Sequence, residues 1–196
     1  MKMVNSDKEL KFLLNKYGFG TDLDSLPDEV FSYLTNPKDP KYSGLRSFAK
    51  DLTKTRQKLY QDGRLGMIID GTGDDFRKIA AEKKELEKIG YDCYMIFVNT
   101  TLEVALERNE NRDRVLPRSI VEASHREVNQ NIGGFQGLFG SSNFMIVDNN
   151  QYKREDQAIK RFGMLVKKGL NSFIKKPITN KKALSWIRKQ KLLRKK

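Results

Sequence analysis

Four short apolar runs, rich in β-branched and aromatic residues, are separated from one another by segments with helical spacing. The runs are Lys2–Val4, Leu65–Asp70, Cys93–Asn99 and Asn143–Asp148. Because a strand that alternates with a helix returns to the sheet in the same direction, this order predicts a parallel α/β sheet with flanking helices.

The intervening segments carry helix signals at their ends. Gly90 is suited to the position after a helix C-terminus, Thr101 to an N-cap, and Pro117 to a first helical turn. We expect an irregular insertion at Tyr17–Ser43 and an end to the helix after Pro117 near Ile132, where Gly133-Gly134 follows. The expected helices are Asp7–Lys16, Leu45–Gln61, Asp74–Ile89, one from Thr101, one from Pro117 and one within 153–176.

The positive charge is concentrated at the C-terminal end. Residues 153–196 hold 16 basic and 2 acidic side chains, whereas residues 1–152 hold 22 basic and 23 acidic ones. We therefore expect a near-neutral body at 1–152 and a basic helical appendage at 153–196, in which Ile159, Phe162 and Leu165 face the body and Trp186 lies among lysines. The appendage is either an attachment for an anionic partner such as nucleic acid or a solvated lysine-rich helix, and both readings stay open.

Composition narrows the environment of the protein. The single cysteine, Cys93, lies in an apolar run and is expected to behave as a small hydrophobe, which excludes disulfides. No apolar run approaches 18 residues and no basic leader precedes one, so we expect a cytoplasmic protein without a membrane partner. The sequence leaves the oligomeric state open.

An arginine pair is the first candidate for chemistry. Arg108 and Arg112 lie one helical turn apart and can present two guanidinium groups to phosphate oxygens. The alternative is a salt-bridged solvated face, because Glu107, Glu110 and Asp113 alternate with the arginines.

Three motifs in this order resemble those of P-loop kinases of the polynucleotide kinase and zeta toxin-like group. They are Asn5-Ser6-Asp7 after the first run, Asp70-Gly71-Thr72 after the second, and Arg108 to Arg112 followed by Val115-Leu116-Pro117. The resemblance covers nearly all of residues 1–150 and implies a kinase-like fold with ATP and Mg²⁺ as cofactors.

The resemblance also implies roles for individual residues. Asp7 would be the catalytic base and Arg112 the contact to the transferred phosphate. Asp70 would hold the magnesium ion, and nucleotide contacts would come from Arg108, Thr72 and Asn149. Simpler readings remain: Ser6 or Asp7 as a helix N-cap, and polar turns at Asp70 and Asn149. His125, the only histidine, is expected to be structural.

One part of the kinase pattern is absent from the 196 residues. No G-x-x-x-x-G-K-[ST] phosphate loop occurs, and the strand that carries it in the family would lie between those at Leu65–Asp70 and Cys93–Asn99. We therefore expect two buried strand edges without partners, and a truncated, split or late-started kinase. The phosphate acceptor stays open among a nucleic-acid 5′-hydroxyl, a nucleotide, a sugar and a protein hydroxyl. The rivals are a nucleic-acid-binding protein and an inactive remnant.

Overall fold

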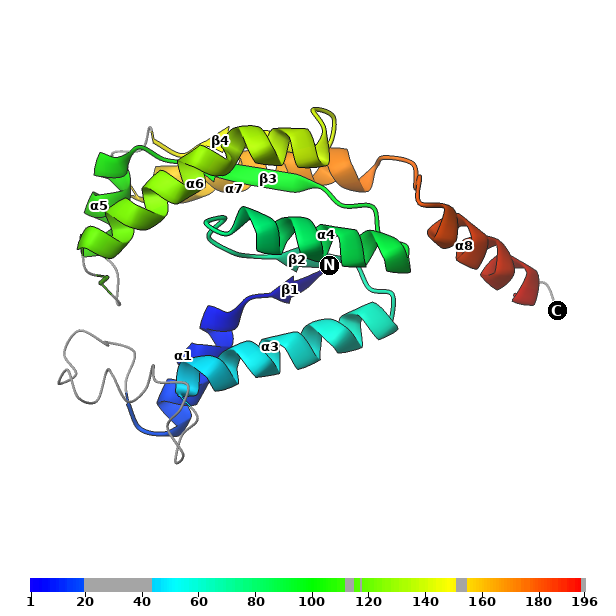
Figure 1. The fold of residues 1–196 in the computed structure, drawn as a ribbon, viewed down its shortest axis with the longest axis horizontal. Coiled ribbons are helices and arrows are strands. Elements are labelled where there is room, and N and C mark those ends of the chain that lie inside the picture. The colour runs from blue at the N-terminus through cyan, green and yellow to red at the C-terminus, as the bar shows by residue number, and fades with distance from the viewer. Residues whose placement is uncertain (20–43, 112–114, 117, 151–154, 195–196) are drawn as a thin grey trace. The chain divides into compact units, whose positions relative to one another are not determined.

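The computed structural model describes residues 1–19, 44–111, 115–116, 118–150 and 155–194 (Figure 1). Most of the insertion expected at Tyr17–Ser43 lies outside these residues, as do the side chains of Ile159 and Phe162. The described strands are β1 (Lys2–Val4), β2 (Met67–Ile69), β3 (Met95–Asn99) and β4 (Phe144–Asp148). The described helices are α1 (Ser6–Lys16), α3 (Leu45–Asp62), α4 (Phe76–Ile89), α5 (Leu102–Glu110), α6 (Arg118–Phe139), α7 (Glu155–Ile174) and α8 (Lys181–Leu193).

The strands form two parallel pairs. β1 pairs with β2, with Val4 opposite Ile69, and β3 pairs with β4, with Asn99 opposite Asp148. A mixed α/β chain with parallel strands is therefore confirmed, although the described strands make two small sheets instead of one. Among the described residues β2 and β3 each have one partner, as expected. Exposure varies along both strands: Ile69 of β2 is 40% and Val98 of β3 is 42% exposed, whereas Phe97 of β3 is buried.

The chain divides into two compact units, which we describe separately. The first comprises Met1–Thr72 with Glu107–Ile120, and the second Gly73–Leu106 with Val121–Lys196. This division differs from the one at residue 152 that charge alone suggested, because α7 packs against β3 and β4 within the second unit.

The core of the first unit lies between α1 and α3. Leucines one turn apart on α1 pack against the N-terminal half of α3, burying Leu10, Leu13, Leu14, Leu45 and Ala49. Glu9 is also buried, and its carboxylate accepts a hydrogen bond from the Arg56 guanidinium on α3. These contacts fix the direction in which α1 leaves β1.

The second unit is built around the covering of β3 and β4 by α7. Gly169 allows close approach, because a Cβ there would meet the end of the Met145 side chain at 2.0 Å. The Phe173 ring stacks on Tyr94 with centroids 4.9 Å apart, and the Lys176 ammonium lies 5.4 Å from the Tyr94 ring centroid. The segment therefore packs on the strands through Gly169 and Phe173. Leu165, which was expected to face the body, is exposed.

Helix α6 continues through Gly133-Gly134 to Phe139, so the expected stop near Ile132 is wrong. A Cβ at Gly134 would meet the Phe76 ring of α4 at 2.9 Å, and the next residue, Phe135, is fully buried with its ring centroid 5.5 Å from that of Phe76. Gly134 thus serves a close helix contact. Its helix-breaking tendency is overridden by the burial of Phe135.

Helix α8 starts at a defined attachment to the end of α4. The Asn180 side chain caps α8 by accepting from the Lys182 N–H, and its amide donates to the carbonyl oxygen of Glu87 at 2.8 Å. The Thr179 hydroxyl donates to Asp92 at 2.7 Å. Within the described part of the chain, no helix combines the length and apolarity needed to cross a membrane.

Candidate active site at the ends of β1 and β2

The parallel pairing of β1 and β2 brings two polar segments to one edge of the small sheet. The Asp70 N–H donates to the carbonyl oxygen of Val4 at 3.0 Å, which extends the ladder one residue beyond β2. Asn5 and Asp70 therefore emerge side by side at the carboxyl ends of their strands, the edge at which parallel α/β sheets bind ligands.

Asn5 joins the two strand ends to the start of α1. Its Nδ2 donates to Asp70 Oδ2 at 2.7 Å, and its Oδ1 accepts from the Asp7 N–H at 2.7 Å. Asn5 is thus the N-cap of α1, and the expectation that Ser6 or Asp7 caps this helix is wrong. Sequence reasoning assigned Asn5 no role, although asparagine is among the strongest N-cap residues and directly precedes the helix.

Asp7, the candidate base, lies in the exposed first turn of α1 and is ion-paired across the unit. Its Oδ1 accepts a hydrogen bond from Arg46 Nη1 on α3 at 2.5 Å. The packing of α1 on α3 sets this distance, because both residues lie at the N-terminal ends of the two packed helices. The pairing of Arg46 with Asp7, 39 positions away in the chain, is known only from the structure.

Asp70 and Thr72 lie in the exposed turn that follows β2. Among the described residues no cluster of three or more His, Cys, Asp or Glu could enclose a metal ion. A single carboxylate nevertheless suits Mg²⁺, which is commonly held by one or two carboxylates together with water and substrate phosphates. Asp70 fits that donor set, with one oxygen already oriented by the Asn5 amide.

The arginine segment is held by a residue that the sequence did not single out. Asn109, buried at the end of α5, donates from Nδ2 to the Leu116 carbonyl oxygen at 2.8 Å and accepts from the Leu116 N–H at 3.0 Å. Arg108 is half-buried beside it in the last turn of α5, and Arg112 lies outside the described residues. Asn109 thus ties together the two ends of the segment that contains Arg112.

Asn149 belongs to the second unit, at the end of β4. Its N–H donates to the Asn99 carbonyl oxygen at 2.9 Å, continuing the ladder of β3 and β4, and the neighbouring Asn150 Oδ1 accepts from the Thr101 N–H at 2.6 Å. The structure therefore shows a polar turn at this strand end.

Of the candidate residues, Asp7 and Asp70 are linked through Asn5 and held with Arg46 in one cluster. Arg108 is not part of this cluster, and Asn149 lies in the second unit.

Two other reactive side chains have structural surroundings. The His125 ring lies in α6 with Nε2 2.9 Å from the Thr100 carbonyl oxygen, as a donor to it. Burial, followed by the negative charge of Glu87, raises the pKa of the Cys93 thiol to about 11, so this cysteine is protonated at neutral pH. Neither environment is that of an activated nucleophile.

No family model, curated protein or solved structure matches the chain. The function is therefore argued from the residues at the ends of β1 and β2.

Proposed function

We propose that the chain is the catalytic body of an ATP-dependent phosphotransferase that acts on a hydroxyl group. The observation that carries the proposal is the cluster at the coincident ends of two parallel strands, in which Asn5 bonds Asp70 and Arg46 pairs with Asp7. Two carboxylates with distinct partners at one sheet edge suit two separate tasks, the acceptance of a proton and the binding of a metal ion.

In this proposal Asp7 accepts the proton of the acceptor hydroxyl, and Arg46 fixes the orientation of its carboxylate. Asp70 holds Mg²⁺, which would neutralise charge on phosphate oxygens when bound. Arg108 and Arg112 clamp the nucleotide and the transferred phosphate, since guanidinium groups bind phosphate oxygens with two hydrogen bonds. Thr72 lines the nucleotide site, on resemblance alone. Asn149 lies in the second unit and carries no part of this proposal.

Such a body needs a cradle of backbone N–H groups for the β- and γ-phosphates, and the phosphate-loop motif that supplies it in P-loop kinases does not occur in the 196 residues. In the described residues β2 has a partner only on its β1 side. A strand supplied on a separate segment would pair with the other edge of β2 and carry its phosphate loop to the turn at Asp70. We propose that activity requires this complement.

The test compares the chain alone with the chain joined to a designed strand, phosphate loop and helix. We expect calorimetry to show magnesium-dependent ATP binding only in the joined protein, together with transfer of the γ-phosphate to one of a panel of hydroxyl acceptors. The panel contains a 5′-hydroxyl oligonucleotide, a nucleoside, a sugar and a protein.

In the joined protein, Asp7→Asn is expected to lower turnover by about 10²–10⁴-fold while ATP affinity is unchanged, since it removes the base and spares the phosphate contacts. The matched control is Asp51→Asn, an exposed α3 carboxylate that pairs with Lys54. A folded joined protein that binds no ATP would refute the proposal, and equal turnover of the two variants would remove Asp7 from the chemistry.

A further inference from the structure

The outward face of α7 is cationic. On the inward side Gly169 and Phe173 are buried, facing β3 and β4. The exposed side carries four lysines, Lys160, Lys167, Lys168 and Lys175. At a rise of 1.5 Å per residue these four span about 22 Å along the helix. The buried side of α7 is therefore occupied by its own unit. The exposed side presents these lysines together with three apolar side chains, Met164, Leu165 and Ile174.

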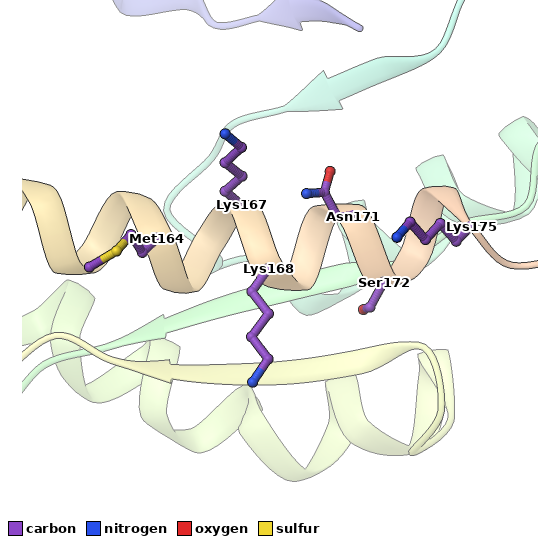
Figure 2. A pocket seen from close by; sticks show the side chains of 6 residues that line it. All are labelled: Met164, Lys167, Lys168, Asn171, Ser172 and Lys175. Carbon is purple, nitrogen blue, oxygen red and sulfur yellow. The ribbon is translucent and has the colours of Figure 1, made fainter.

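Three of these lysines are among the six residues, all from α7, that line an open surface hollow of about 570 Å³. Figure 2 shows Lys167 and Asn171 extending to one side of the helix and Lys168 and Ser172 to the other, with Met164 and Lys175 towards its two ends. The lining thus offers three ammonium groups, an amide and a hydroxyl. This is the donor set that phosphate oxygens accept from.

The lysines of α7 lie in a part of the chain with few carboxylates. Some lysines of α3 and α4 pair with a carboxylate one turn away, as Lys58 does with Asp62 and Lys83 with Glu87. Among the described residues, no ion pair involves Lys167, Lys168 or Lys175, and residues 157–196 contain no Asp or Glu. In the described part of α7, Lys167, Lys168 and Lys175 therefore do not belong to a salt-bridged solvated surface.

Helix α8 continues this charge on a fixed support. Its half-buried side includes Leu184 and Ile187, while the exposed side carries Lys181, Lys182, Arg188 and Lys189. The attachment of Thr179 and Asn180 to the end of α4 holds the first turn in place. Trp186, 40% exposed, lies on the same helix.

We propose that the outward lysine faces of α7 and α8 bind single-stranded nucleic acid through its phosphate backbone, without sequence preference. Nucleic acid is inferred as the partner because its phosphates complement the positive charge of these lysines. A single strand is favoured over a duplex because only unpaired bases offer a face on which Trp186 can stack. A membrane surface is the alternative partner, because α7 also exposes Met164, Leu165 and Ile174, and the vesicle measurement below decides between the two. This binding does not depend on the phosphotransferase activity.

The magnitude follows from counterion release. The two faces hold eight basic side chains, Lys160, Lys167, Lys168, Lys175, Lys181, Lys182, Arg188 and Lys189. With a slope of about −0.7 per neutralised phosphate, contact by all eight gives a slope of log K against log salt near −5 to −6. Removing three contacts lowers the slope by about 2 and weakens binding about 100-fold at 0.1 M salt.

The experiment uses the full chain and a fluorescent 20-nucleotide oligo-dT, titrated by anisotropy between 0.05 and 0.3 M salt. The first variant, K167Q/K168Q/K175Q, removes the α7 charges, and the second, K181Q/K182Q/R188Q/K189Q, removes those of α8. The matched control, K11Q/K78Q/K84Q, removes three exposed lysines from α1 and α4. Fluorescence of Trp186, the only tryptophan, reports contact with α8.

We expect the control to bind as the unmodified chain does, and both test variants to lose affinity and salt slope, with Trp186 fluorescence changing on binding. Equal binding by control and α7 variant would overturn the role of α7; should that variant not fold, the α8 variant decides alone. Absence of oligo-dT binding at 0.05 M salt, or binding to phosphatidylserine vesicles in preference to oligo-dT, would overturn the proposal.

Discussion

The substitution Asn5→Asp tests the connection between the two strand ends. Asp and Asn are equally good N-cap residues, so the hydrogen bond from the Asp7 N–H is kept. The substitution replaces the Asn5 Nδ2 group, which donates to Asp70 Oδ2 at 2.7 Å, with a carboxylate oxygen. The lost hydrogen bond to a charged group at an exposed site costs about 1 kcal/mol, and two carboxylates about 4 Å apart in a nearly aqueous setting repel by about 1 kcal/mol more. The expected loss of stability is about 2 kcal/mol.

The double variant Asn5→Asp with Asp70→Asn reverses donor and acceptor, and it should recover stability to within about 0.5 kcal/mol of the unmodified chain. Urea unfolding followed by circular dichroism measures the free energies, and hydrogen exchange of residues 4–16 localises the effect to α1. The deficit of the single variant should shrink in 1 M salt, because screening reduces the repulsion. If single and double variants are equally destabilised, the contact between Asn5 and Asp70 does not connect the strands.

Two further predictions concern the second unit. Gly137 lies in open space on α6, so Gly137→Ala should stabilise the protein by about 0.5–1 kcal/mol through helix propensity. At Gly134 an added Cβ meets the Phe76 ring, so Gly134→Ala should be at least about 1 kcal/mol less stable than Gly137→Ala in urea unfolding. Equal stabilities of the two variants would mean that α6 and α4 are not in close contact. Because the pKa of Cys93 is raised from 9.0 to about 11, its thiolate fraction at pH 8 is about 100-fold below that of an exposed cysteine. The rate of its alkylation by iodoacetamide, followed by mass spectrometry, should therefore be about 100-fold lower in the folded protein. In urea the rate should rise to that of an exposed cysteine. An unchanged rate on unfolding would contradict this.

Secondary structure was predictable to the extent that its signals are local. The four strands lie where apolar spacing places them, and their observed ends differ from the predicted ends by no more than about two residues. The helix α4 ends before Gly90 as predicted, and the φ of Gly90 is +115°. The error at Gly133-Gly134 has a non-local cause, since the glycine that sequence reads as a stop is required by Phe76, 58 positions earlier in the chain. Local propensity was outweighed there by burial of Phe135.

Three features could be read from spacing along the chain: the alternation that makes parallel pairs, the charge at the C-terminal end, and the places of Asp7 and Asp70 shortly after strands. Two contacts could be seen only in the folded chain, namely the hydrogen bond of Asn5 to Asp70 and the pairing of Arg46 with Asp7, 39 positions away. Those contacts depend on the register of β1 with β2 and on the packing of α1 against α3. Both are set by burial of side chains that are far apart in sequence, which no local pattern records.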